Sequence, residues 1–366
     1  MIKLLNLLLT TILIVGCQSI QQSSYHNLPK PVNIAILLPL SHDKAYQRWN
    51  ELIYLGLQDG AARNINVISY DISNEKTIDT TMQKVLAAKT NIILGPVTSD
   101  ITNQVANIAK KHNIITISLS NDPSLAQQDV YVFGHSPLQQ TKKLLNSLNQ
   151  QGFSNIIFLL PNNRKSNNLA NALSDIAMME QMTVLSVVKY SDTLDSTNPN
   201  SINQKIKLVN RIINDSMLSD NNKVALYVAD DADKLTTLFD VIKQHRLDEQ
   251  AIICGENKID IKYPKGINLL FTGWPEGAKV SSIMSRMNVN YLNFWDKLAY
   301  DLGIIVSYAI GVEDFNKAQF IEKLNNSSGY VGMSGRTTIL DYAATRQYQI
   351  IKRSGMQYNA YEGNER

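Results

Sequence analysis

The chain alternates between short runs of apolar residues and longer stretches in which apolar residues recur every three or four positions. Short β-branched runs are typical of buried strands, and the three-to-four spacing is typical of amphipathic helices. Strands that alternate with helices in this way predict an α/β fold with parallel sheets. The predicted strands are Asn33–Leu38, Asn66–Tyr70, Ile92–Leu94, Ile114–Ile117, Val130–Phe133, Asn155–Leu160, Thr183–Tyr190 and Lys223–Val228.

One stretch of this pattern, Asn91–Asp122, combines a strand, a helix and a second strand. The first strand ends at the turn pair Gly95-Pro96, and hydroxyl residues then precede apolar positions at helical spacing. The carboxyl ends of neighbouring parallel strands meet at one edge of a sheet, where ligands of such folds bind. We therefore expect Gly95–Asp100 and Ser118–Asp122 to lie side by side at a ligand-facing edge.

Three segments resemble the type I periplasmic binding proteins, the superfamily of the leucine/isoleucine/valine receptors. They are ILGP at 93–96, SND at 120–122 and VFGHSPLQQ at 132–140. Their order is most similar to that in a branch called penicillin-binding protein activators. The resemblance covers nearly the whole chain beyond its N-terminal segment. It implies an α/β fold of two Rossmann-like lobes, each a parallel sheet flanked by helices, joined by a multi-strand hinge.

The resemblance also implies where the chain crosses between the lobes. Leu269–Trp274 is expected to carry it back to lobe one, and Gly329–Gly335 to lead to a last piece of lobe two. A helix from Leu292 to Ile310 contains Ala299-Tyr300-Asp301, which resembles a signature of the superfamily. The expected boundaries are 31–135 plus 270–328 for lobe one, 136–269 plus 329–355 for lobe two, and 356–366 for a flexible tail.

The N-terminal residues predict export. Lys3 gives a positive start, and the apolar run Leu4–Val15 is too short to span a bilayer. We expect residues 1–16 to be a lipoprotein signal peptide, because Ile14–Cys17 resembles a bacterial lipobox. An ordinary cleaved signal or a short anchor is the alternative.

Cys17 would then become the acylated N-terminus of the mature chain. Residues 17–30 are predicted to form a polar tether, so that lipid attaches the body to a membrane. Gln18 follows the cysteine, which favours the outer membrane of a Gram-negative cell. The expected location is therefore an outer-membrane lipoprotein that faces the periplasm.

Composition narrows the function classes. Without residues 1–16 the 366-residue chain is still long enough for two domains. Its net charge of +3, without a dense basic block, argues against a nucleic-acid partner. With Cys17 acylated, Cys254 is the other cysteine of the sequence, so an intramolecular disulfide is excluded.

Catalytic and metal-binding motifs find little support in the sequence. The five histidines are scattered, without the spacings of a metal site. Ser73–Lys76 is a formal SxxK and Ser219–Asn221 a formal SDN, but the KTG element that accompanies them in penicillin-interacting enzymes is missing. We expect no catalytic residue, no metal ion and no cofactor.

The candidate binding residues follow from the resemblance to amino-acid receptors. In lobe one, Ser99, Ser120 and Asn121 would supply hydroxyl and N–H groups to a carboxylate and an amino group. In lobe two, Asp231 and Glu256 stand where those receptors place an aromatic and an acidic residue. The alternative is structural: Ser99 caps the helix, and Ser120-Asn121 shape the turn.

Two functions remain open at this point. The activator resemblance implies a non-enzymatic regulator that contacts a class A penicillin-binding protein and stimulates peptidoglycan synthesis. The receptor resemblance implies a protein that delivers an amino acid or similar small molecule to an ABC permease. The enterobacterial activator has an additional N-terminal helical-repeat domain, for which this sequence offers no room.

Overall fold

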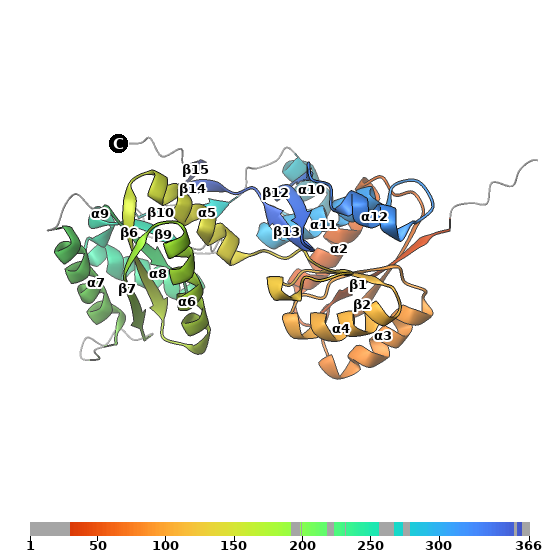
Figure 1. Cartoon of the computed structure of the whole chain (residues 1–366), viewed down its shortest axis with the longest axis horizontal. Helices are drawn as coiled ribbons and strands as arrows, with labels where there is room; N and C mark the ends of the chain where they lie inside the picture. Colours follow the sequence, from red (N-terminus) through yellow and green to blue (C-terminus); the bar gives the residue numbers. More distant parts are fainter. Residues whose placement is uncertain are drawn as a thin grey trace, which may run out of the picture.

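The computed structural model describes residues 30–191, 198, 200–217, 223–230, 232–255, 267–273, 279–354 and 357–360. Within them, the strands form two mostly parallel sheets with helices on both faces. Each sheet and its helices make one lobe, and Figure 1 shows the two lobes side by side, lobe one on the right. The predicted α/β fold of two lobes is confirmed.

Lobe one is built on eight of the described strands, in the order β11-β12-β13-β5-β4-β3-β1-β2. The first five strands along the chain are parallel to one another, and β11 and β12 pair antiparallel. The bounds are β1 (Val32–Leu38), β2 (Ile65–Asp71), β3 (Ile92–Leu94), β4 (Ile115–Ser118), β5 (Val130–Val132), β11 (Tyr330–Gly332), β12 (Gly335–Leu340) and β13 (Ala343–Arg346).

Alternating side chains of β1 reach two hydrophobic cores. Ile34 and Ile36 belong to the core under α2 and α11, while Ala35 and Leu37 belong to the core under α3 and α4. The strand is buried on both faces from Ile34 to Leu38 and is apolar throughout that run, as its sequence predicted. The bounds of these helices are α2 (Lys44–Asp59), α3 (Ile78–Ala87), α4 (Ser99–Lys111), α10 (Lys279–Met287), α11 (Phe294–Ile310) and α12 (Lys317–Leu324).

Lobe two repeats this arrangement around seven of the described strands, in the order β15-β14-β10-β9-β8-β6-β7. Its bounds are β6 (Phe153–Pro161), β7 (Thr183–Tyr190), β8 (Lys223–Val228), β9 (Ile252–Gly255), β10 (Asn268–Gly273), β14 (Gln349–Ser354), β15 (Gln357–Ala360), α5 (Pro137–Gln150), α6 (Arg164–Met179), α7 (Ile202–Met217), α8 (Ala232–Gln244) and α9 (Leu247–Gln250). Ile157 and Leu159 of β6 pack with α7 and α8, and Phe158 packs with α5 and α6. Cys254 is buried in this second core as a free thiol, and burial raises its pKa.

The chain crosses between the lobes at places that differ from the predicted boundaries. The strand β10, expected in lobe one, pairs with β9 and β14 in the sheet of lobe two. Residues 330–346, expected in lobe two, form β11–β13 of lobe one. The predicted boundaries near 270 and 329 are therefore wrong, because a buried apolar run fits either sheet and its pairing partner is not encoded locally.

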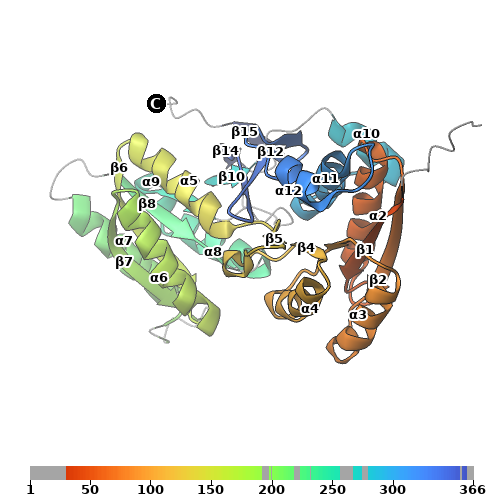
Figure 2. The ribbon, with the colours of Figure 1, turned by 45° about the vertical axis from the view of Figure 1, so that its right-hand side comes forward.

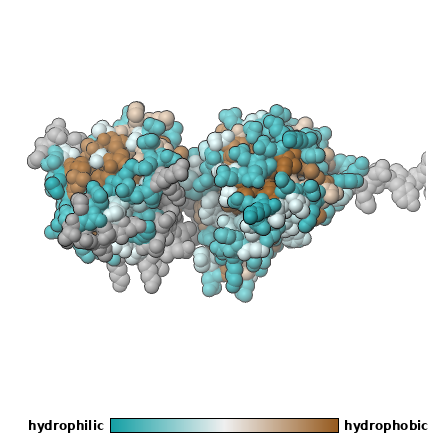
Figure 3. Space-filling model, turned by 90° about the horizontal axis from the view of Figure 1, so that it is seen from below, coloured by the Kyte–Doolittle hydropathy of each residue, from teal (hydrophilic) through white to brown (hydrophobic). Residues whose placement is uncertain are grey.

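The crossings are close together in space. The first is Phe133–Ser136, between β5 and α5, and a later one is Gln347-Tyr348, between β13 and β14. Figure 2 shows β12 and β14 near each other at the top, with the lobes diverging below them. In the space-filling view of Figure 3 the lobes form two separate masses with an indentation between them, each carrying a hydrophobic area on a largely hydrophilic surface.

The two ends of the chain are described only in part. Residues 1–16, Cys17 and nearly all of the predicted tether lie outside the described residues. Part of the predicted flexible tail is regular, since Gln357–Ala360 is a strand paired with β14. Among the described helices, none combines the length and apolarity needed to cross a membrane.

Candidate functional site

The carboxyl ends of β3 and β4 carry the lobe-one part of the candidate site. The turn after β3 requires glycine, because Gly95 has a φ of +98° and a Cβ there would clash with the carbonyl oxygen of Leu37. A second clash would arise at Gly134, whose Cβ would strike the carbonyl of Ser120. The backbone N–H of Leu119 also donates to the Pro96 carbonyl at 2.8 Å, so the turn and the end of β4 lie side by side, as predicted. The Gly134 contact adds the first crossover to the same edge.

Four hydroxyl groups form a connected network at this edge. The Oγ atoms of Ser99 and Ser120 are 3.1 Å apart, and the hydroxyls of Thr102 and Ser118 are 2.7 Å apart. The Ser118 hydroxyl donates to the Pro96 carbonyl at 3.0 Å and accepts from the backbone N–H of Ser120, also at 3.0 Å. The structure therefore brings together Ser99 and Ser120, two of the predicted binding residues.

Asp122 lies beside Ser99 and Ser120, and we call these three residues the polar ring. Hydrogen bonds from Ser124, opposed by partial desolvation, and a further hydrogen bond from Ser99 hold the pKa of Asp122 below its usual range. The backbone N–H of Asp122 donates to Ser120 Oγ at 3.2 Å. One of the Ser99 and Ser120 hydroxyls donates to the other, so at least one serine proton is used within the ring. The role of Asp122 was not predicted from the sequence.

The alternative role predicted for Ser99, a helix cap, is not what the structure shows. Thr98 occupies the N-cap position of α4, and its side chain makes no capping hydrogen bond. Ser99 is the first helical residue, and its hydroxyl points to Ser120 instead of an orphan N–H group. Asn121 is exposed beside this ring.

Both lobe-two candidates lie beyond what the structure describes. Asp231 and Glu256 are outside the described residues. The preceding residue Asp230 is buried and accepts a hydrogen bond of 2.5 Å from the Tyr190 hydroxyl. The strand that leads to Glu256 runs close to its neighbour, because a Cβ on Gly255 would clash with the Val228 carbonyl. This edge is therefore tightly packed where it is described.

Arg346 connects two crossovers, and the sequence gave no sign of it. Its guanidinium donates to the carbonyls of Phe133 at 2.6 Å and Gly134 at 3.0 Å, and it lies 4.7 Å from the centre of the Phe133 ring. Burial lowers the pKa of Arg346, although an arginine of ordinary pKa above 12 stays charged. The last residue of β13 thus holds the first crossover in place.

The AYD segment has a structural role in lobe one, within electrostatic reach of Arg346. The Asp301 carboxylate is fully buried and accepts from the backbone N–H groups of Met333 at 2.7 Å and Ser334 at 2.6 Å, and from the Ser334 hydroxyl at 2.5 Å. Burial raises the pKa of Asp301, while these hydrogen bonds oppose the shift. The segment resembling the superfamily signature therefore anchors the β11–β12 turn.

The chemistry available at this edge is recognition by hydrogen bonds. The serine hydroxyls meet other hydroxyls, a carbonyl and a carboxylate, so none has the imidazole or amine partner of an activated nucleophile. Among the described residues, no three His, Cys, Asp or Glu side chains cluster closely enough to hold a metal ion.

Comparisons with known proteins support a binding-protein fold. A family model described as periplasmic binding protein matches residues 55–210. The uncharacterized protein RP748 of Rickettsia prowazekii is 32% identical over 336 residues, which cover 90% of this chain and 88% of that protein.

Solved structures share the fold at low sequence identity. The periplasmic ligand-binding protein of a branched-chain amino acid ABC transporter from Burkholderia xenovorans has a TM-score of 0.72 at 10% identity, covering 90% of this chain and 94% of that one. The C-domain of LpoA from Haemophilus influenzae, a regulator of PBP1A, has a TM-score of 0.62 at 16% identity, covering 90% and 99%. The chain belongs to the same family as RP748 and has the fold of the type I periplasmic binding proteins.

Proposed function

We propose that the protein is a non-enzymatic, periplasm-facing lipoprotein that regulates a class A penicillin-binding protein in peptidoglycan synthesis. Cys17 would attach it to the outer membrane, and the two-lobed body would bind the synthase. The fold is that of binding proteins. The sheet edge at which ligands of such folds bind carries serine hydroxyls that hydrogen-bond to one another.

The polar ring of Ser99, Ser120 and Asp122 carries this proposal. An amino-acid receptor needs free hydroxyl protons and no competing negative charge where the carboxylate of its solute binds. Here one serine proton is used between Ser99 and Ser120, and the Asp122 carboxylate belongs to the same group of side chains. A second negative charge placed beside Asp122 would be repelled. The ring therefore disfavours a carboxylate solute.

The activator-like segments support the same proposal. The SND triplet supplies two members of the ring, and the VFGHSPLQQ segment forms the first crossover and the start of α5. One neighbour with the same fold, the LpoA C-domain, is a regulator of PBP1A. These segments contribute both to the candidate site and to a crossover between the lobes. Such a segment is suited to couple a contact made at the site to the angle between the lobes.

A solute receptor of an ABC importer is the second candidate, and one observation favours it. The N-terminus of α4 has no side-chain cap, so its N–H groups and the positive end of its dipole remain available to an anionic group. In this reading Ser99, Ser120, Asn121, Asp231 and Glu256 would surround the small molecule.

A paired binding experiment tests the choice. Purified mature protein is screened for thermal stabilisation by amino acids and short peptides, and immobilised protein is tested for retention of the class A penicillin-binding proteins of the same cell. We expect a retained synthase and no stabilisation by single amino acids. A receptor at a hundredfold excess of solute over its Kd would gain roughly 3 kcal/mol instead. That gain with one solute, without a retained synthase, would move the assignment to transport.

A further inference from the structure

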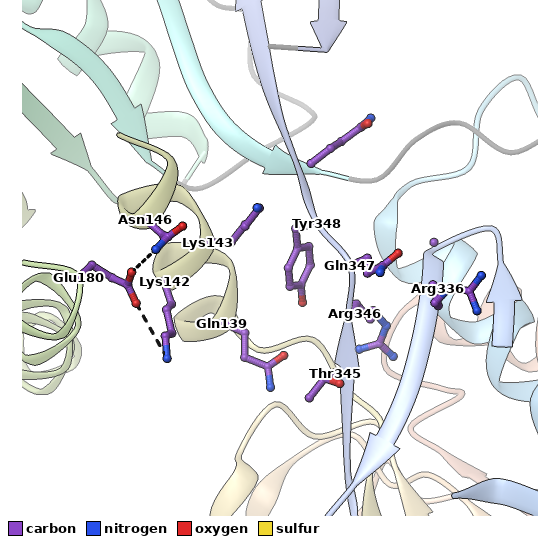
Figure 4. Close-up of a pocket in the computed structure, with 12 residues that line it drawn as sticks. Gln139, Lys142, Lys143, Asn146, Glu180, Arg336, Thr345, Arg346, Gln347 and Tyr348 are labelled. Carbon is purple, nitrogen blue, oxygen red and sulfur yellow. Dashed lines mark hydrogen bonds and ion pairs between the residues drawn. The ribbon is translucent and has the colours of Figure 1, made fainter. Parts of the chain in front are cut away.

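A groove of about 780 Å³ lies where the chain passes from β13 to β14. One wall is the face of α5 in lobe two that carries Gln139, Lys142, Lys143 and Asn146 at helical spacing. The other wall is β12 and β13 of lobe one together with the crossover itself. Figure 4 shows the Tyr348 ring in the space between α5 and the crossing strand. The groove is therefore a feature shared by both lobes.

The charge of this groove is strongly unbalanced. Its lining carries four basic side chains, Lys142, Lys143, Arg336 and Arg346, and one carboxylate, that of Glu180. Glu180 accepts from Asn146 at 2.6 Å and lies 3.9 Å from the Lys142 ammonium group, so it offsets one cation weakly. A net positive groove of this kind attracts anions from solution.

Two of the remaining cations, Arg336 and Lys143, have no carboxylate partner among the described residues, whereas buried Arg346 is within electrostatic reach of the Asp301 carboxylate. Arg336 donates to the backbone carbonyl of Ser328, and Arg346 donates to those of Phe133 and Gly134, so both keep their full charge. The exposed ammonium group of Lys143 has no hydrogen bond or ion pair with the described residues.

We propose that this groove binds an acidic peptide segment of a protein partner. The charge calls for carboxylates, and the volume falls in the range of ligand pockets and far exceeds that of a single small anion. The Tyr348 ring and the lysine stems add apolar surface for a peptide between its charges. The inference rests on the proposed function only for the identity of the partner, since the preference for an acidic peptide is a property of the groove.

The test uses a fluorescent oligoglutamate peptide, whose anisotropy is followed as the full mature protein is added at low ionic strength. We expect saturable binding that weakens as salt is raised. The double variant Lys142→Gln/Lys143→Gln should weaken it by about tenfold, which corresponds to the loss of modest interactions from two charges.

The matched control is Lys110→Gln/Lys111→Gln in the last turn of α4. These two lysines are also adjacent, exposed and helical, and their replacement changes the net charge equally, but they do not line the groove. Thermal unfolding of both variants checks that each is folded. Because all four side chains are exposed, we expect unchanged midpoints.

Three results would overturn the proposal. The first is absence of peptide binding, and the second is equal weakening of binding by both double variants. The third is competition by inorganic phosphate at the same molarity as unlabelled peptide, which would assign the groove to small anions. Retention of a synthase by the Lys142→Gln/Lys143→Gln variant, with peptide binding lost, would leave the proposed function standing and remove only the groove from it.

Discussion

At the scale of residues, Asp71 shows how short polar side chains at a strand end can fix a charge. It is the last residue of β2 and accepts from the backbone N–H groups of Ser73 at 3.0 Å and Ser41 at 3.4 Å, and from both serine hydroxyls. Desolvation opposes ionisation here, but the hydrogen bonds from Ser41 and Ser73 outweigh it and lower the pKa of Asp71 to about 2.

The first prediction concerns this carboxyl group. Its pKa is depressed in the folded state, so its stabilising effect is present above pH 3.8, its ordinary value, and is lost as the pH falls towards 2. Ser73→Ala removes the hydroxyl donor, so we expect the pKa to rise towards the ordinary value. Carbon-detected NMR titration of Asp71 would measure it, and an unchanged pKa in the variant would contradict the assignment.

The second prediction concerns the buried carboxylate of Asp301. Asp301→Ala would leave two buried N–H groups and one hydroxyl without their acceptor, so we expect a loss of roughly 3 kcal/mol or more in the free energy of unfolding. Asp240→Ala on the exposed face of α8 is the control and should change stability by less than about 0.5 kcal/mol. Urea denaturation of the three proteins compares them.

The sequence identified some of these residues and missed others for a physical reason. The strand–helix–strand pattern was enough to place Ser99 near Ser120, because topology alone brings those strand ends together. The hydrogen bonds of Asp122 with Ser120 and Ser124 are local, but those of Asp301 and Arg346 depend on groups that meet only after distant segments have packed. Asp301 reaches Ser334, and Arg346 reaches Phe133, across long separations in the chain. No local pattern encodes such pairs.

At the scale of elements, α2 and α11 approach each other more closely than side chains would allow. A Cβ on Gly56 would overlap the Tyr300 carbonyl of α11, and one on Gly303 would overlap the Ile53 carbonyl of α2. Both glycines are helical, so they are retained at a cost in helix propensity of about 1 kcal/mol each relative to alanine. The contact between the backbones requires them.

The third prediction follows from this contact. Gly303→Ala would raise the helix propensity of α11, yet we expect it to destabilise the protein by about 2 kcal/mol, because the helices must separate to admit the methyl group. The sign is the informative result, and calorimetric unfolding gives it. A more stable variant would show that the two helices yield without cost.

The elements themselves could be predicted well, but their grouping could not. Thr183–Tyr190 and Lys223–Val228 were predicted with the bounds that the structure has. The misplaced elements are β10 and β11–β13, which lie next to crossovers. Hydrophobic periodicity reports that a strand is buried and not in which of two similar sheets it is buried.

At the scale of the whole molecule, the fourth prediction concerns the membrane anchor. Cys17 is preceded by a short apolar run and a lipobox-like segment, so Cys17→Ala should yield an unlipidated protein. Metabolic labelling with palmitate would detect the difference. Equal labelling of the variant and the wild-type protein would rule out this site.

The late return of the chain to both sheets has a consequence for biogenesis. Lobe one receives β11–β13, and lobe two receives β14 and β15, from residues 330–360. A nascent chain that has not yet supplied this segment lacks strands in each sheet, and Asp301 lacks the donors that satisfy its charge. Neither lobe can therefore complete its sheet before nearly the whole polypeptide has been synthesised. One late segment thus sets the time at which both lobes can finish folding.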